Sequence, residues 1–161
     1  IEEQVRLWGA KNFAMKNIKS TAWYPIGQAA IFVLASMEVF RWDNNEIRKM
    51  GENAPKVSLV VKLLFKPFVN IEKLAKEIPS FWRKNYTIGW VEVAKIDMDK
   101  KEMILKYHDC YFHPALCHFL EGYAEKILQF TRPQGSVLTV KEIECSFNSH
   151  KNCEVFQVNW T

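Results

Sequence analysis

The stretch that decides the fold is residues 117–160, CHFLEGYAEKILQFTRPQGSVLTVKEIECSFNSHKNCEVFQVNW. Its first part carries apolar residues at helical spacing, and its second part holds two short segments that are rich in strand-forming residues. A polar loop from Ser146 to Asn152 separates these two segments, with Cys145 on one side and Cys153 on the other. The stretch therefore predicts a helix followed by a β-hairpin that brings two sulfurs near each other.

The helix is expected to begin at Pro114 and to end near Phe130. Proline is favoured in the first turn of a helix, and the sequence Arg132-Pro133-Gln134-Gly135 stops it. Its apolar stripe consists of Leu116, Phe119, Leu120, Tyr123, Ile127 and Phe130. The two strands of the hairpin are expected at Val137 to Cys145 and at Cys153 to Trp160.

A second hairpin is predicted just before this helix. Residues Trp90 to Ile96 are rich in strand formers, Asp97 to Lys101 is a polar turn, and Glu102 to His108 is the returning strand. Two hairpins joined by one helix do not show the regular strand–helix alternation of a parallel sheet. The sequence therefore predicts an α+β fold with a mostly antiparallel sheet of about four strands.

The first half of the chain reads as helices that pack on this sheet. Helices are expected at residues 1–20, 28–41, 56–67 and 70–84, with Pro67 and Pro79 as breaks. A further short helix has the spacing of a capping box, Asp43 to Glu46, and is expected to stop near Gly51. We divide the chain into an N-terminal helix, 1–22, for packing or dimerisation, and a ligand-binding domain, 23–161.

Composition excludes some functions. The 161 residues are 48% hydrophobic and 14% aromatic, which suits a thick core or an apolar pocket. The formal charge is +4 without a run of five like charges, so direct nucleic-acid binding is not expected. The longest apolar runs are too short to span a membrane, and no signal peptide is visible, which favours a cytoplasmic location. The chain starts at Ile1 and not at Met, which suits either a trimmed chain or a domain excised from a longer protein.

The cysteines and one glutamate suggest a metal site. Cys117 lies in the first turn of the predicted helix, where the helix dipole favours a thiolate. Glu142 stands three residues before Cys145, so the two side chains can meet only if the strand has a bulge or turn at Ile143. Three thiolates and one carboxylate could close a tetrahedral structural zinc site. On spacing alone, a disulfide between Cys145 and Cys153, or reduced buried thiols, remain equally open.

These residues resemble a known family. Cys117-His118-Phe119-Leu120-Glu121-Gly122-Tyr123 is similar to a helix motif of the 4-vinyl-reductase-like domains, and Glu142-Ile143-Glu144-Cys145 and the spaced Cys145 and Cys153 are similar to its strand motifs. The family includes input domains of bacterial activators that sense aromatic compounds. Its fold is similar to that of haem-nitric-oxide-binding domains and vesicle-tethering subunits. The resemblance covers about a quarter of the chain.

The resemblance implies a structural zinc held by Cys117, Glu142, Cys145 and Cys153. One departure is the absence of glycine from the loop between the last two cysteines. There Asn148 or Asn152 is expected to take the left-handed conformation instead.

The resemblance also implies that a small hydrophobic or aromatic ligand binds between the helices and the sheet. Each aromatic residue in this region could either fill the core or line the ligand pocket. Tyr86 and Tyr107 also carry a hydroxyl that could orient a ligand. The candidate wall residues are Trp82, Tyr86, Trp90, Tyr107, Phe112, Phe119 and Tyr123.

No nucleophile elbow, HExxH pair or phosphate-binding glycine loop is present, so we expect no catalytic residues and no enzyme. The leading hypothesis is a sensor domain that acts in transcription regulation, as a homodimer or through a fused or partner effector domain. A haem ligated by His108 or His113, an accessory role in tetrapyrrole metabolism and a protein-binding scaffold are the alternatives.

Overall fold

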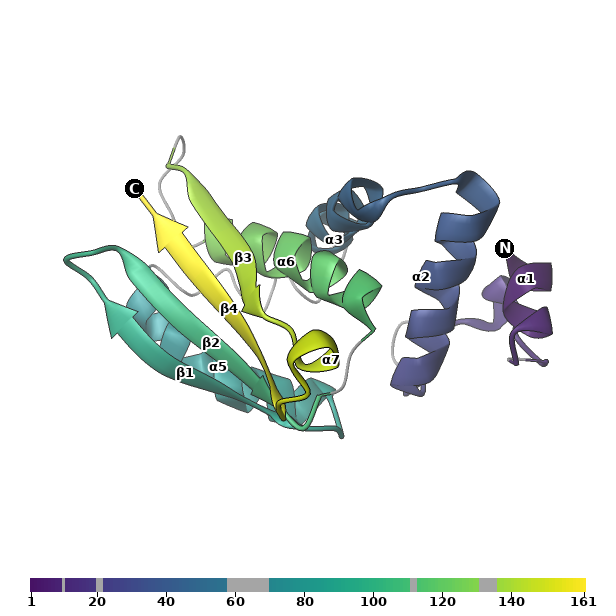
Figure 1. Cartoon of the computed structure of the whole chain (residues 1–161), viewed down its shortest axis with the longest axis horizontal. Coiled ribbons are helices and arrows are strands. Elements are labelled where there is room, and N and C mark those ends of the chain that lie inside the picture. Colours follow the sequence, from purple (N-terminus) through teal and green to yellow (C-terminus); the bar gives the residue numbers. More distant parts are fainter. Residues whose placement is uncertain (10, 20–21, 58–69, 111–112, 131–135) are drawn as a thin grey trace.

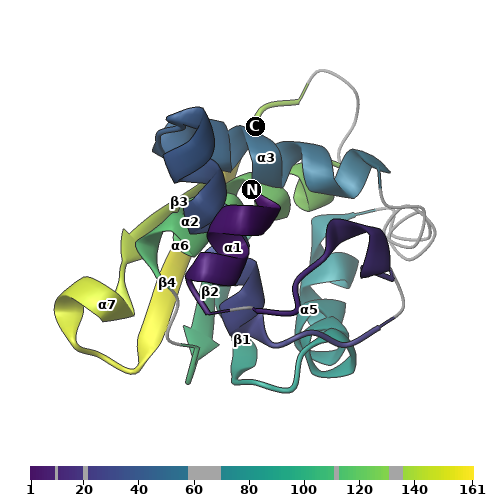
Figure 2. The ribbon, with the colours of Figure 1, turned by 90° about the vertical axis from the view of Figure 1, so that its right-hand side faces the viewer.

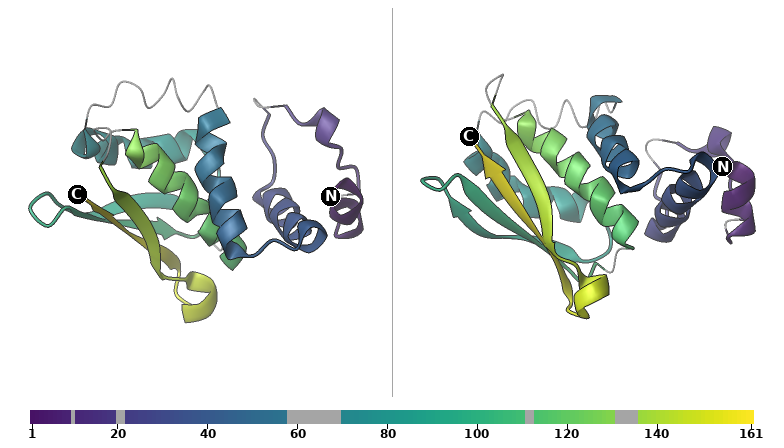
Figure 3. Two further views of the ribbon diagram at one scale, coloured as in Figure 1. Left: turned by 90° about the horizontal axis from the view of Figure 1, so that it is seen from above. Right: turned by 45° about the horizontal axis from the view of Figure 1, so that its top comes forward.

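The computed structural model describes residues 1–9, 11–19, 22–57, 70–110, 113–130 and 136–161. A four-stranded sheet forms one layer, and helices cover one of its faces (Figure 1). The view from above shows this layering, with the N-terminal helices beyond the end of the sheet (Figure 3). The predicted α+β class and the antiparallel sheet are confirmed in the described residues.

The sheet has the strand order β1-β2-β4-β3, and all its pairings are antiparallel. The strands are β1 (Trp90–Asp97), β2 (Glu102–His108), β3 (Leu138–Glu144) and β4 (Cys153–Trp160). Each boundary lies within one residue of its sequence prediction. Alternate residues of β2 are buried because they face the helices, as period-two patterning requires. The β2 residues of the core are Met103, Leu105 and Tyr107.

Two helices pack directly against the sheet, α5 (Ile71–Asn85) and α6 (Pro114–Gln129). Asn70 caps α5 by accepting a hydrogen bond from the backbone N–H of Lys73, and the side chain of His113 accepts from Ala115 at the start of α6. Pro79 lies inside α5 and does not break it, contrary to expectation.

Helix α3 (Asn44–Val57) begins with the predicted capping box. The Asp43 carboxylate accepts from the backbone N–H groups of Asn45 and Glu46, and the Glu46 carboxylate accepts from Asp43 N–H. The expected end near Gly51 is wrong, because the helix continues to Val57 with Pro55 in its last turn. Gly51 does not stop the helix; it lies against the backbone of α6.

Helices α3 and α6 cross at two glycines. A Cβ on Gly51 would overlap the backbone carbonyl of Phe119, and a Cβ on Gly122 would overlap the carbonyl of Arg48. Only residues without a Cβ let the two helix backbones approach this closely. The Gly122 of the sequence motif is therefore a packing residue.

Strand β3 is an edge strand whose outer backbone groups are bound by side chains. Glu125 accepts from Val140 N–H at 3.1 Å, and Glu121 accepts from Glu142 N–H at 2.7 Å. Arg48 donates to the Val140 carbonyl at 3.2 Å and forms ion pairs with both glutamates. These contacts take the place of a neighbouring strand and tie α3, α6 and β3 together.

The N-terminal prediction of one helix over residues 1–20 is wrong. Helix α1 (Glu2–Leu7) is short, and a 3₁₀ turn follows at Met15–Asn17. Gly9 adopts a φ of 123°, which a continuing helix does not allow. Helix α2 (Ile26–Phe40) matches its prediction and packs against α1 and α6 (Figure 2).

The predicted helix at 56–67 lies mostly outside the described residues. None of the helices in the described part of the chain is both long and apolar enough to cross a membrane.

Candidate functional site

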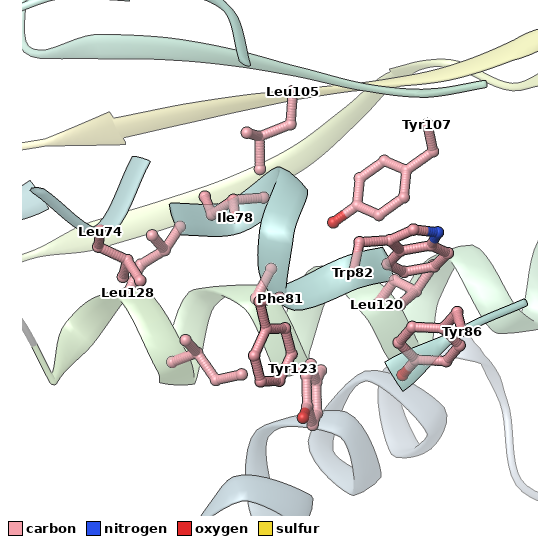
Figure 4. Close-up of a pocket in the computed structure, with 12 residues that line it drawn as sticks. Leu74, Ile78, Phe81, Trp82, Tyr86, Leu105, Tyr107, Leu120, Tyr123 and Leu128 are labelled. Atoms are coloured by element: carbon pink, nitrogen blue, oxygen red, sulfur yellow. The ribbon is translucent and has the colours of Figure 1, made fainter. Parts of the chain in front are cut away.

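An apolar cavity of about 70 Å³ lies between α5, α6 and the inner face of β2 (Figure 4). This is the place where the sequence resemblance implies a ligand. Four of the predicted wall residues line it: Trp82, Tyr86, Tyr107 and Tyr123. The sequence analysis did not predict the other wall residues, which are aliphatic apart from Phe81. Their only signal in the sequence is the spacing of apolar residues in a helix or strand. They are Leu74, Ile78, Phe81, Leu105, Leu120, Ala124, Ile127 and Leu128.

The aromatic rings of this cavity pack on each other. Trp82 stacks on Tyr86 with ring centroids 4.0 Å apart, and it meets the edge of Tyr107 at 5.2 Å. The indole N–H of Trp82 donates to the carbonyl of Ile88 at 2.9 Å, which fixes the ring. Burial raises the pKa of Tyr86, of Tyr107 and of Tyr123, so all three phenols stay neutral near pH 7.

The other three predicted wall residues do not line this cavity. Trp90 is 45% exposed and stacks on His108, on the sheet face opposite the helices. Phe119 stacks on Tyr123 and faces a second hollow. Phe112 lies outside the described residues.

The second hollow is an open groove of about 850 Å³ between the N-terminal segment and helices α2, α3 and α6. Most of its wall is apolar, and two of its aromatic residues, Trp23 and Tyr24, are exposed. The lining includes Phe13, Trp23, Tyr24, Phe32, Met50, Leu116 and Phe119.

A cluster of metal-ligand side chains lies where α6 meets the β3–β4 hairpin. The ligand atoms of Cys117, Glu142, Cys145 and Glu154 all lie within 4.8 Å of one another. Three of these four are ligands implied by the sequence resemblance. The fourth position is taken by Glu154, which the sequence analysis missed because its neighbour Cys153 matched the family motif.

A bulge in β3 makes this cluster possible. The register between β3 and β4 shifts between Glu142 and Glu144, which leaves Ile143 unpaired and 53% exposed. Without that extra residue, alternation would place Glu142 and Cys145 on opposite faces. The sequence requirement for a bulge or turn at Ile143 is thereby confirmed.

The cluster concentrates buried acids. Glu154 is fully buried and accepts hydrogen bonds from the backbone N–H and the hydroxyl of Ser146, at 2.7 and 2.6 Å. One carboxylate oxygen of Glu142, Oε1, is buried without a hydrogen-bond partner. Burial of a carboxylate oxygen that lacks a partner is costly. A metal ion bound by this cluster would satisfy the Glu142 oxygen.

The electrostatics of the cluster differ from the sequence expectation at Cys117. The helix start was expected to favour a thiolate, but burial, followed by the Glu142 carboxylate, raises the pKa of the Cys117 thiol. Burial also raises the pKa of Cys145, and it raises the pKa of Glu142 to about 7. Desolvation among carboxylates therefore outweighs the helix dipole, and only a bound cation would reverse the shifts.

Cys153 lies outside the four-residue cluster, at the position of β4 that pairs with His108 of β2. All four cysteines are free thiols, so Cys145 and Cys153 form no disulfide here. In the loop between them, His150, with φ of 56°, takes the left-handed conformation expected of an asparagine.

The two histidines considered for haem do not face the cavity. His108 hydrogen-bonds Glu92 at 2.9 Å on the outer face of the sheet, and His113 caps α6. Neither is among the described residues that line the cavity or the groove. A cavity of about 70 Å³ is also far below the roughly 300–1,000 Å³ of pockets for larger ligands. The residues present do not fit a haem ligated by either histidine.

The raised pKa of Glu142 predicts a pH dependence for the metal-free protein. Its folded-state pKa of about 7 lies above the ordinary value of 4.5, so folding favours the protonated acid. The stabilisation is full below the ordinary pKa and is lost as the pH rises through 7. Allowing for solvent screening, we expect a loss of roughly 1–2 kcal/mol between pH 5 and pH 8, measured by urea unfolding with chelator present.

The control for this prediction is Glu142→Gln, which cannot ionise and should remove most of the dependence. A dependence of equal size in that variant would assign it to another group.

No family model matches the sequence, and no curated protein matches it. Solved structures do match. An H-NOX protein from S. oneidensis in the Fe(II)NO ligation state is 11% identical with a TM-score of 0.68, over 99% of this chain and 87% of that chain. The phenol-responsive sensory domain of the transcription activator PoxR, solved with phenol, is 13% identical with a TM-score of 0.63, over 91% of this chain and 83% of that chain. A mutant H-NOX protein from T. tengcongensis is 11% identical with a TM-score of 0.63, over 100% of this chain and 86% of that chain. The chain therefore has the fold of these domains.

Proposed function

We propose that this chain is a small-molecule-binding sensor domain for a hydrophobic or aromatic ligand. The observation that carries the proposal is the apolar cavity between α5, α6 and β2, which four predicted wall residues line. The fold shared with the phenol-responsive domain of PoxR supports it. Ligand binding there would shift α6, which also contacts α2, α3 and β3, and would pass the change to a partner subunit or effector domain.

The proposal includes a structural zinc ion. Cys117, Glu142 and Cys145 supply three ligands of types that zinc binds, and Glu154 stands at the fourth position. A closed site of this kind leaves no position for a reacting water, so its role is to hold the β3–β4 hairpin on α6. The unpartnered Glu142 oxygen supports a cation here.

The cavity also favours ligand binding over a scaffold that binds only protein, because a scaffold does not require an unfilled interior. The small volume of the cavity counts against the alternative role in tetrapyrrole metabolism, because a tetrapyrrole is a large ligand.

Thermal melting tests the proposal. A ligand at about 100 times its Kd stabilises the folded state by roughly 2.7 kcal/mol, which for a chain of this size raises Tm by about 5–10 °C. We expect such a shift with at least one small apolar compound, together with a change in the fluorescence of Trp82. Ala124→Met, which extends a side chain into the cavity, should abolish both responses. If no apolar compound shifts Tm, the proposal is wrong.

A further inference from the structure

The hydroxyl of Tyr107 is a polar group held inside an apolar cavity. Tyr107 is only 7% exposed, and edge contacts with Trp82 at 5.2 Å and with Phe156 at 5.3 Å fix its ring. Figure 4 shows its hydroxyl directed into the cavity. It forms no hydrogen bond with any residue that the structure describes. A buried hydroxyl without a partner is costly, and a ligand atom that bonds to it recovers that cost.

The other hydroxyls that border the cavity belong to Tyr86 and Tyr123, and both residues are less buried than Tyr107. The Trp82 N–H is already bonded to the Ile88 carbonyl, so the indole is not available as an anchor. No charged side chain is among the described residues that line the cavity. A ligand carrying a charge would be buried without a counter-ion, which strongly disfavours binding.

The size of the cavity sets a third limit. A volume of about 70 Å³ holds more than a single water molecule, yet it is about half that of an engineered cavity of ~150 Å³ that binds benzene. The ligand is therefore small, and even one of about six heavy atoms requires wall side chains to move outward.

From these three limits we infer that the cavity selects a small, neutral molecule with an apolar body and one hydrogen-bond-accepting oxygen, which the Tyr107 hydroxyl binds. This inference rests on the proposed function and makes Tyr107 the residue that determines specificity. It separates a ketone, ether or alcohol from a hydrocarbon of the same shape and from a carboxylate.

Three probes of nearly equal size test this selection: 2-pentanone, n-pentane and butyrate. Butyrate is ionised at about pH 7.5 and replaces one methyl group of 2-pentanone with a charged oxygen. Affinities are measured by titration of Trp fluorescence and by melting temperature. We expect 2-pentanone to bind at least about tenfold more tightly than n-pentane, and butyrate to show no binding.

Tyr107→Phe keeps the ring and removes only the hydroxyl. In this variant we expect the preference for 2-pentanone over n-pentane to disappear, while n-pentane binds as well as before. Tyr24→Phe is the control, because it also removes a phenol hydroxyl but Tyr24 does not line this cavity, and it should keep the tenfold preference.

The outcomes separate this inference from the proposed function. Equal binding of 2-pentanone and n-pentane, tight binding of butyrate, or an unchanged preference in Tyr107→Phe overturns the inference and leaves a binding cavity in place. If none of the probes and no other apolar compound binds, both are overturned.

Discussion

Replacement of Gly122 by alanine is expected to destabilise the protein by about 3 kcal/mol or more. The added Cβ would overlap the backbone carbonyl of Arg48, where α6 crosses α3. A backbone carbonyl cannot rotate away as the end of a side chain can, so the two helices must separate. That separation also strains the ion pairs of Arg48 with Glu121 and Glu125. Urea unfolding followed by circular dichroism measures the loss.

Gly27→Ala is the matched control. Gly27 lies in the first turn of α2, and a Cβ built there meets nothing within 4 Å. Alanine favours the helix over glycine, so this variant should be unchanged or more stable by up to about 1 kcal/mol. If Gly122→Ala were as stable as Gly27→Ala, the close crossing of α3 and α6 would be wrong.

The second large effect is expected at the cluster between α6 and the β3–β4 hairpin. Protein purified without added metal should contain about one zinc per chain, and Cys145→Ser should lose both the metal and much of the stability. Structural zinc sites contribute roughly 10–16 kcal/mol of apparent binding free energy in zinc-finger peptides. Loss of even part of that is comparable with the whole stability of a small domain. Elemental analysis and melting with and without chelator are the measurements.

Cys110→Ser is the control, because Cys110 is buried but is not part of the cluster. It should keep the zinc. Protein that contains no zinc, or a chelator that leaves Tm unchanged, would contradict the prediction and remove the metal from the proposed function.

A pair of neighbouring variants identifies the fourth ligand. The geometry predicts that Glu154→Gln weakens zinc binding and that Cys153→Ser retains it, since only Glu154 is in the cluster. The sequence resemblance predicts the reverse. Substitution with Co²⁺ gives an independent readout, because the intensity of its thiolate absorption rises with the number of bound sulfurs.

The sequence by itself determined the hairpins and the helix between them. Residues 90–108 and 114–160 show the apolar spacing of strands and of a helix. This spacing reflects which side chains each element must bury, and it can be read locally from the sequence. The same is true of the Asp43 capping box and of the requirement for a bulge at Ile143, since both follow from fixed backbone geometry.

Only the tertiary structure decided where the helices end and which residues meet. Gly51 signals a helix end in the sequence, yet it packs against α6, and long-range contact outweighed local preference. Trp90 and Tyr107 are both aromatic residues of predicted strands. They lie on opposite faces of the sheet, so Trp90 is exposed and Tyr107 lines the cavity. Neighbouring residues of a strand point to opposite faces, so Glu154 entered the cluster and Cys153 did not. A sequence motif fixes the types of ligand, whereas strand register fixes which of them face one another.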